Sequence, residues 1–322
     1  MEILNGSARR AWETRSENFG ERIYFFAPSL KRYDISEFQA RQNTFFAPIS
    51  ITGSTCQLSC DHCRGKILEG MLSAQDPRSL WRLGKKLSER GCRGLLITGG
   101  SLKDGRVPLM RFMSTIGRLK SELGLKIAVH TGLVDDGLAD GLAKAEIDVA
   151  MMDIIGSEET IGTVYHLSAS LPDFENSLAI LIKRGIRVSP HLVIGLHWGK
   201  IIGEKRALRI ISTYDVYSLV LVVLTPLHNT PMEGISPPRL KEVGELLAEA
   251  RLHFPHTPIL LGCAKPLGRY KDMVEQLALS MGLNGIAYPG EKVVKLARKA
   301  GLQPIFSHYC CSLIFATESV KH

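Results

Sequence analysis

Long apolar runs are absent from this sequence. The longest uninterrupted run extends only from Leu219 to Leu224, whereas a membrane-spanning helix needs roughly 20 apolar residues. The N-terminus mixes charges of both signs and lacks the apolar stretch of a signal peptide. These absences predict a cytoplasmic protein with no membrane-spanning segment.

The sequence also lacks a strong excess of acidic or basic residues. Lys and Arg number 40 against 32 Asp and Glu, which gives a net charge of +8 and a pI of about 9.1. The basic residues are scattered in short pairs such as Lys85-Lys86, with no aromatic-interleaved patch, so nucleic acid is not expected as a partner. The surface is typical of an ordinary solvated protein, and an acidic partner remains an alternative.

The composition is that of a globular chain. With 322 residues and 45% hydrophobic residues, the protein can bury about three quarters of its surface without any cross-link. In the reducing cytosol, clustered cysteines are metal ligands or catalysts more often than disulfide partners. The seven cysteines are therefore the residues to explain.

Short β-rich apolar runs alternate with longer amphipathic segments along the chain. Helix end signals mark these segments, for example Asp76-Pro77 before one of them and Gly91 after it. Near-continuous apolar strands joined by helices indicate a parallel sheet covered on both faces. The eight expected strands span residues 48–52, 94–98, 126–130, 148–153, 187–196, 218–224, 258–264 and 284–288.

Eight β/α units in about 255 residues match a closed (β/α)8 barrel of the TIM type, with a partial barrel or a doubly wound sheet as alternatives. We expect residues 46–300 to form this barrel. Residues 1–45 are polar without a sustained period and are expected to be an N-terminal extension. Residues 301–322 are expected to be a C-terminal tail that closes the barrel mouth, where strands end and the chemistry of this fold lies.

Three cysteines directly follow the first expected strand with C-x3-C-x2-C spacing: Cys56, Cys60 and Cys63. Three thiolates on one loop can bind three irons of a [4Fe–4S] cube, and the fourth iron then has no protein ligand. Zinc would need a fourth ligand, which His62 is poorly placed to supply. A redox-active C-x-x-C pair would open a helix. The spacing favours the cluster over these two alternatives.

This motif after the first strand of a β/α barrel resembles that of the radical S-adenosylmethionine (SAM) superfamily, and the resemblance runs from residue 46 to about residue 290. In that family the open iron binds SAM, and an electron from the cluster cleaves SAM to a 5′-deoxyadenosyl radical. The residue before the third cysteine, here His62, packs near the adenine. The resemblance implies a [4Fe–4S] cluster on Cys56, Cys60 and Cys63, with SAM as the second cofactor.

Later strand ends match other SAM-binding elements of the family. Gly99, Gly100 and Ser101 resemble its Gly-Gly-Glu element, whose backbone holds the methionine amine, although Ser101 replaces the usual acid. A tight turn is the alternative. Ile194 and Gly195 resemble the apolar strand end whose backbone contacts the adenine, with core packing as the alternative.

His130 and Asp153 close the third and fourth expected strands, where side chains would point into the barrel mouth. A buried aspartate needs hydrogen-bond donors, and the two ribose hydroxyls of SAM would supply them. We therefore expect both residues to bind SAM. The alternatives are a helix N-cap for Asp153 and a satisfied core histidine for His130.

A second group of cysteines lies in segments that a barrel brings to the same mouth. Cys263 ends the seventh strand, and Cys310 and Cys311 lie in the tail. We hypothesise that these three hold an auxiliary iron–sulfur cluster, which would act in catalysis as the sulfur donor. Small buried residues are the alternative. Cys92, just before the second strand, is expected to be a core residue.

An auxiliary cluster beside a radical generator suggests sulfur insertion. The chain resembles biotin synthase in architecture, but its downstream cysteines do not fall on the strands that hold that enzyme's sacrificial cluster. The segment from Cys60 to Met71 is similar to the extended motif of a subunit of the two-component lipoyl synthases of archaea and some bacteria.

That resemblance implies an octanoyl group on an acidic lipoyl carrier protein as substrate, a second radical SAM subunit, and an electron donor such as ferredoxin. Two alternatives remain. One is another biotin synthase-like radical SAM enzyme, such as a mutase, methyltransferase or maturase. The other is a non-enzymatic barrel that binds a structural cluster or tRNA.

Overall fold

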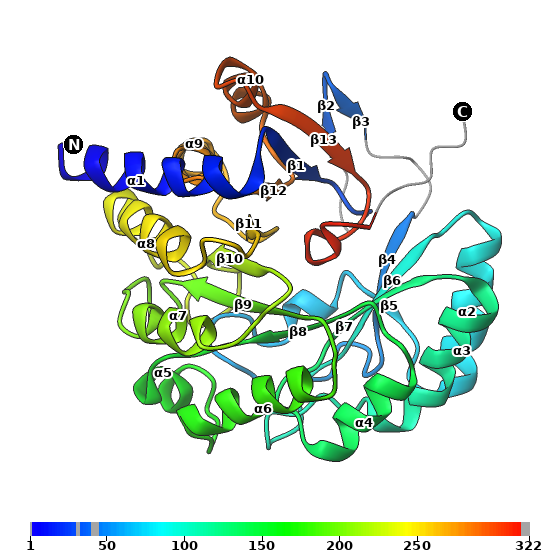
Figure 1. Ribbon diagram of the computed structural model, residues 1–322. Helices are drawn as coiled ribbons and strands as arrows, with labels where there is room; N and C mark the ends of the chain where they lie inside the picture. The colour runs from blue at the N-terminus through cyan, green and yellow to red at the C-terminus, as the bar shows by residue number, and fades with distance from the viewer. Residues whose placement is uncertain (1, 30–32, 40–44, 317–322) are drawn as a thin grey trace.

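A curled parallel sheet forms the centre of the molecule in the computed structural model, which describes residues 2–29, 33–39 and 45–316. The sheet has 11 strands in the order β13-β1-β12-β11-β10-β9-β8-β7-β6-β4-β5. A separate hairpin is made of β2 (Asp34–Ile35) and β3 (Phe38–Gln39). The sheet curls into an open barrel, with the helices on its outer face (Figure 1).

The strands of the sheet are short. They are β1 (Arg22–Phe26), β4 (Phe46–Ser50), β5 (Leu72–Ser73), β6 (Gly94–Thr98), β7 (Lys126–His130), β8 (Val149–Asp153), β9 (Val188–Ile194), β10 (Leu219–Val223), β11 (Ile259–Leu261), β12 (Gly285–Ala287) and β13 (Gln303–Ser307).

Helices connect most successive strands. The α-helices are α1 (Glu2–Phe19), α2 (Pro77–Glu89), α3 (Met113–Leu123), α4 (Asp136–Lys144), α5 (Glu158–Thr163), α6 (Leu171–Lys183), α7 (Glu204–Ser212), α8 (Leu240–His253), α9 (Arg269–Ser280) and α10 (Glu291–Lys299), and the short 3₁₀ turns are η1 (Lys66–Leu68), η2 (Met110–Phe112) and η3 (Cys311–Leu313). Among the described residues, none of these helices has the length and apolar character that a membrane crossing requires.

The expected α/β fold is confirmed. All eight apolar runs are strands, β4 and β6 to β12, and they pair in parallel in chain order. Their side chains are buried nearly throughout, which explains why the runs carry no polar alternation. The carboxyl ends of these strands define one open end of the barrel, called the mouth below.

The barrel is open, which is the partial barrel given above as an alternative to a closed one. Strand β1 pairs with β12, with Tyr24 opposite Gly285, and β13 pairs with the other edge of β1. Gly285 permits this approach, because a Cβ there would lie 2.9 Å from the Tyr24 carbonyl oxygen. Since β1 occupies the edge of β12, β4 pairs only with β5 and β6 among the described strands.

The sheet therefore extends across both expected boundaries, at residues 45 and 300. The N-terminal segment expected as an extension contains an 18-residue helix, α1, and the strand β1. Helix α1 packs against α8 on the outside of the barrel. The C-terminal segment begins with β13, which is an edge strand of the same sheet.

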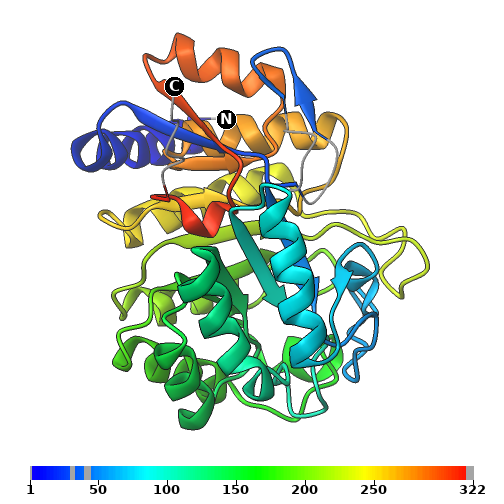
Figure 2. The ribbon, with the colours of Figure 1, turned by 90° about the vertical axis from the view of Figure 1, so that its right-hand side faces the viewer.

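The tail after β13, expected to close the barrel mouth, turns into the barrel. Turn η3 contacts β8, β10 and β12, and Figure 2 shows it folded back beneath β13. Tyr309, Leu313 and Ile314 share one buried cluster with strand residues such as Ala128 and Val149. The tail thus fills part of the barrel interior.

Candidate active site

The loop after β4 carries Cys56, Cys60 and Cys63, and residues 52–65 are called the cysteine loop below. It lies against the loop after β6: the Gly100 N–H donates to Thr52 Oγ1 at 2.7 Å, and the Gln57 N–H donates to the Ser101 carbonyl at 2.8 Å. A Cβ on Gly100 would lie 2.0 Å from the Thr55 carbonyl oxygen. Because Gly100 has no Cβ, the backbone of the Gly99-Gly100-Ser101 element can lie directly against the backbone of the cysteine loop.

The three thiols of this loop perturb one another. Cys60 and Cys63 are buried and Cys56 is partly exposed. Contact with Cys60, together with His62, lowers the pKa of Cys63 to about 4 although burial opposes this. Contact with Cys63 and burial raise the pKa of Cys60. Within this pair Cys63 is thus the thiol that loses its proton more readily, and the thiolate is the form that binds iron.

The loop suits a cube better than a single metal ion. No three His, Cys, Asp or Glu side chains of the described chain converge on one ion position. A [4Fe–4S] cube does not need such convergence, because each thiolate binds a different iron. His62 Nδ1 is buried and has no hydrogen-bond partner within the described residues. A buried unpaired nitrogen beside three thiols fits a site completed by a bound group.

The residues after α5 fasten the cysteine loop in place. The Asp61 N–H donates to the Val164 carbonyl at 2.9 Å, and the Asp61 carboxylate lies 3.0 Å from His166 Nε2. The Cys60 thiol donates to the Tyr165 carbonyl at 3.8 Å. The sequence offered no signal for this contact, because no motif links residues 164–166 to the cysteines.

Asp153 and His130 meet at the mouth, as expected from their strand-end positions. Asp153 Oδ1 lies 3.8 Å from His130 Nε2, and the His191 ring lies 5.6 Å from the His130 ring. Burial would raise the pKa of Asp153, but His130 and His191 outweigh it and lower that pKa to about 2. Burial also lowers the pKa of His191 to about 4. The N-cap of α5 is Ser157, so the helix does not use Asp153.

Ile194 and Gly195 end β9 in a tight turn. Ile194 is fully buried, as core packing requires, while the Gly195 N–H donates to Glu204 Oε1 at 2.7 Å. Glu204 Oε2 accepts from the Gly203 N–H at 3.0 Å, and burial raises the pKa of Glu204. Sequence reasoning missed Glu204, for which the signal was a lone acid in the first turn of the helix after a glycine-rich loop.

In the second thiol group, which is Cys263, Cys310 and Cys311, two members lie inside the barrel. Cys310 and Cys311 are buried and hydrogen-bonded to each other, whereas Cys263 is exposed. Cys310, burial and Cys263 together raise the pKa of Cys311, so Cys310 and Cys263 both lie within electrostatic reach of Cys311. Cys92 is buried apart from them, where its thiol donates to the Gly94 carbonyl at 3.1 Å, as expected for a core residue.

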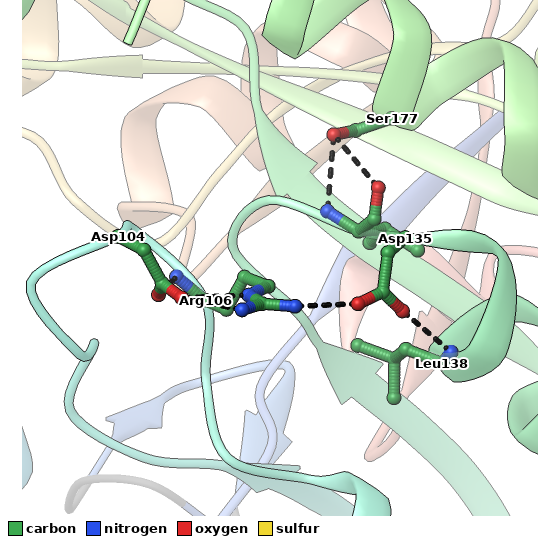
Figure 3. A network of polar contacts seen from close by, with 6 residues as sticks. Asp104, Arg106, Asp135, Leu138 and Ser177 are labelled. Carbon is green, nitrogen blue, oxygen red and sulfur yellow. Dashed lines mark hydrogen bonds and ion pairs between the residues drawn. The ribbon is translucent and has the colours of Figure 1, made fainter. Parts of the chain in front are cut away.

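An ion network braces the rim of the mouth outside these two thiol groups (Figure 3). Arg106 pairs with Asp104 in the loop after β6 and with Asp135 in the loop after β7. Asp135 also caps α4 by accepting from the Leu138 N–H at 2.8 Å. Ser177 Oγ accepts from the Val134 N–H at 3.0 Å. The network joins two neighbouring loops of the rim, and it is exposed enough to contribute little stability by itself.

The low pKa of Asp153 predicts a specific acid dependence. The folded pKa, about 2, lies below the ordinary value of about 3.9, so the carboxylate stabilises the folded state above about pH 4. This stabilisation, about 2 kcal/mol, is lost as the pH falls from about 4 to about 2. In urea denaturation of metal-free protein, we expect Asp153→Asn to lack this part of the acid dependence, and the exposed Asp215→Asn to keep it. An unchanged pH profile for Asp153→Asn would contradict the assignment.

No family model matches the chain. Among curated proteins, the biotin synthase of Halorhodospira halophila is 24% identical over 290 residues, which cover 84% of this chain and 82% of that enzyme. The biotin synthase of Acidithiobacillus ferrooxidans is also 24% identical, over 248 residues, 74% of this chain and 76% of that enzyme. The likeness to biotin synthases thus extends over most of both chains.

Solved structures share the fold. A methylornithine synthase superposes with a TM-score of 0.60 at 20% identity, covering 95% of this chain and 90% of that one. An FeFe-hydrogenase maturase from Carboxydothermus hydrogenoformans superposes with a TM-score of 0.66 at 16% identity, covering 98% of this chain and 75% of that one. The chain is thus similar to biotin synthases over most of its length and has the fold of these two solved enzymes.

Proposed function

We propose that this chain is a radical SAM enzyme that inserts sulfur into the octanoyl chain of a lipoyl carrier protein, as one subunit of a two-component lipoyl synthase of the archaeal type. The observation that carries the proposal is that Cys310 and Cys311 are buried inside the barrel that bears the cysteine loop, with Cys263 within electrostatic reach of Cys311. Such a reaction needs a sulfur donor, which an auxiliary cluster on these thiols would supply.

Cys56, Cys60 and Cys63 would hold the [4Fe–4S] cube, with Cys63 already favouring the thiolate. When bound, the cluster supplies the electron that cleaves SAM to a hydrogen-abstracting radical. Around it, the Asp153 carboxylate would accept the ribose hydroxyls, and His62 would lie near the adenine. Backbone groups of the Gly99-Gly100-Ser101 turn and of Ile194-Gly195 would orient the methionine and adenine ends.

Cys263, Cys310 and Cys311 would hold the auxiliary cluster that provides the sulfur. Lys265 supports this assignment, since its side chain is 2% exposed and its Nζ donates to the Gly262 carbonyl at 3.2 Å. Its positive charge opposes the rise in the pKa of Cys311. Lys265 Nζ also lies 3.6 Å from the buried Glu275 carboxylate. A cluster held by thiolates is an anion, which the nearby Lys265 ammonium would stabilise.

The partners follow from the same proposal. The substrate would be an octanoyl-lysine on an acidic carrier domain, which the net charge of +8 would attract during encounter. A ferredoxin-like donor would supply electrons, and a second radical SAM subunit would perform the other carbon–sulfur bond formation. The distribution of charge gives no reason to invoke nucleic acid.

The decisive experiment is anaerobic incubation of the reconstituted protein with SAM, a reductant and an octanoylated carrier peptide. We expect 5′-deoxyadenosine to form and the peptide to gain the mass of at least one sulfur atom. A Cys310→Ala/Cys311→Ala variant should still cleave SAM without adding sulfur, whereas Cys92→Ala should behave as wild type. If wild type cleaves SAM but adds no sulfur, another biotin synthase-like reaction, such as that of a mutase, methyltransferase or maturase, replaces the proposal.

Iron and sulfide analysis tests the auxiliary cluster separately. A variant with Cys56, Cys60 and Cys63 all changed to alanine should retain iron and sulfide on the second thiol group. If this variant binds no cluster after reconstitution, the proposal of an auxiliary cluster is overturned. The assignment of the radical site to Cys56, Cys60 and Cys63 would not be affected by that result.

A further inference from the structure

Tyr165 contacts both halves of the radical site. Its side chain lies between the cysteine loop and the end of β8, and the residue is 8% exposed. The ring packs against His62 with centroids 5.3 Å apart. The phenol donates to Asp153 Oδ2 at 3.3 Å, and the backbone carbonyl accepts the Cys60 thiol.

The backbone and the side chain of Tyr165 make different contacts. Backbone atoms of residues 164–166 hold the cysteine loop through Cys60 and Asp61, and any residue could supply them. Only the side chain reaches His62 and Asp153. Substitutions of this side chain can therefore separate attachment of the loop from the link to Asp153.

The Asp153 carboxylate is held from two sides. Oδ1 faces His130 at 3.8 Å, and Oδ2 accepts from Tyr165. A buried phenol requires a hydrogen-bond partner, and Asp153 supplies it. The same hydrogen bond fixes the orientation of the Asp153 carboxylate. The side chain that orients Asp153 thus also forms the wall behind His62.

We propose that Tyr165 is a positioning residue that couples SAM binding at Asp153 to the order of the cysteine loop. This inference rests on the proposed placement of the SAM ribose at Asp153. When a ligand contacts Asp153, the rigid ring of Tyr165 passes the resulting restraint on position to His62 and the cysteine loop. Because linkage is reciprocal, SAM stabilises the cluster against loss, and an ordered loop improves the affinity for SAM.

The test measures SAM affinity and iron release rather than turnover. Tyr165→Phe keeps the ring and removes the bond to Asp153, so we expect cluster-loaded protein to bind SAM about tenfold more weakly in equilibrium dialysis. Iron release to a chelator without SAM should stay at the wild-type rate, while the slowing of release by SAM should shrink. Tyr165→Leu also removes the contact with His62 and should release iron about tenfold faster even without SAM.

Tyr214→Phe is the matched control, because its phenol donates to Glu175 at 3.2 Å away from the site. Asp153→Asn distinguishes the placement of the SAM ribose at Asp153 from the coupling role of Tyr165. If Asp153→Asn weakens SAM binding and Tyr165→Phe does not, at an unchanged melting temperature, the coupling role of Tyr165 is overturned. If neither variant changes the affinity for SAM, the placement of the ribose at Asp153 fails, and the inference fails with it.

Discussion

Cys60→Ala is expected to abolish cleavage of SAM, with 5′-deoxyadenosine formation falling below about one hundredth of the wild-type rate. The thiol is buried next to Cys63 and against the Tyr165 carbonyl, so no water or neighbouring side chain can take its place as an iron ligand. The measurement is 5′-deoxyadenosine formed per chain under anaerobic, reducing conditions, together with the electron paramagnetic resonance signal of the reduced cluster.

Cys92→Ala provides the comparison for this loss. Cys92 is also buried, but its thiol contacts backbone at the start of β6 and in β4, through Gly94 and Ala47, away from the cysteine loop. We expect its removal to lower stability by about 1 kcal/mol and to leave SAM cleavage intact. Cleavage by Cys60→Ala within tenfold of the Cys92→Ala rate would remove Cys60 from the ligand set.

Gly100→Ala is expected to displace the cysteine loop. A Cβ at this position would lie 2.0 Å from the Thr55 carbonyl oxygen and 2.6 Å from the Cys56 Cα. Both are backbone atoms of the cysteine loop, so no side-chain rotation can relieve the clash. We expect a loss of stability of about 3 kcal/mol or more, and SAM cleavage reduced about a hundredfold in the protein that still folds.

Alanine substitutions at two other glycines serve as comparisons for the loss of stability and activity expected of Gly100→Ala. A Cβ on Gly70 would have no atom within 4 Å, so Gly70→Ala should be close to neutral. A Cβ on Gly99 would meet side chains of Ile51 and Thr52 at 3.0 Å, which can move, so Gly99→Ala should lie between the two. Thermal unfolding and 5′-deoxyadenosine assays give the order, and a Gly100→Ala protein as stable and active as Gly70→Ala would contradict the close approach.

The strands were predictable because each is buried on both faces. Runs such as Leu219–Val223 are apolar at every position, so the sequence itself carries the signal of a parallel sheet. The cysteine loop was predictable for a related reason, since its three ligands lie within eight residues of chain. Both are local patterns that do not depend on what the rest of the chain does.

The features that escaped prediction depend on distant partners. Strand β1 is only five residues long and becomes part of the sheet because β12 and β13 accept it on both edges. The tail packs inside the barrel in one buried cluster with Ala128 and Val149, a contact between distant segments that no local pattern records. Tyr165 carries no motif, because its role arises from where α5 ends relative to the cysteine loop.

The placement of β1 has a consequence for how the chain folds during synthesis. Residues 22–26 are made well before their partners around Gly285 and Ile305. At roughly 5 to 20 residues per second, β1 waits roughly 15 to 50 s before β12 is made. Its apolar side chains, Ile23 and Phe25, have no sheet to join in that interval, so the nascent chain is expected to need chaperone protection until β12 and β13 are available.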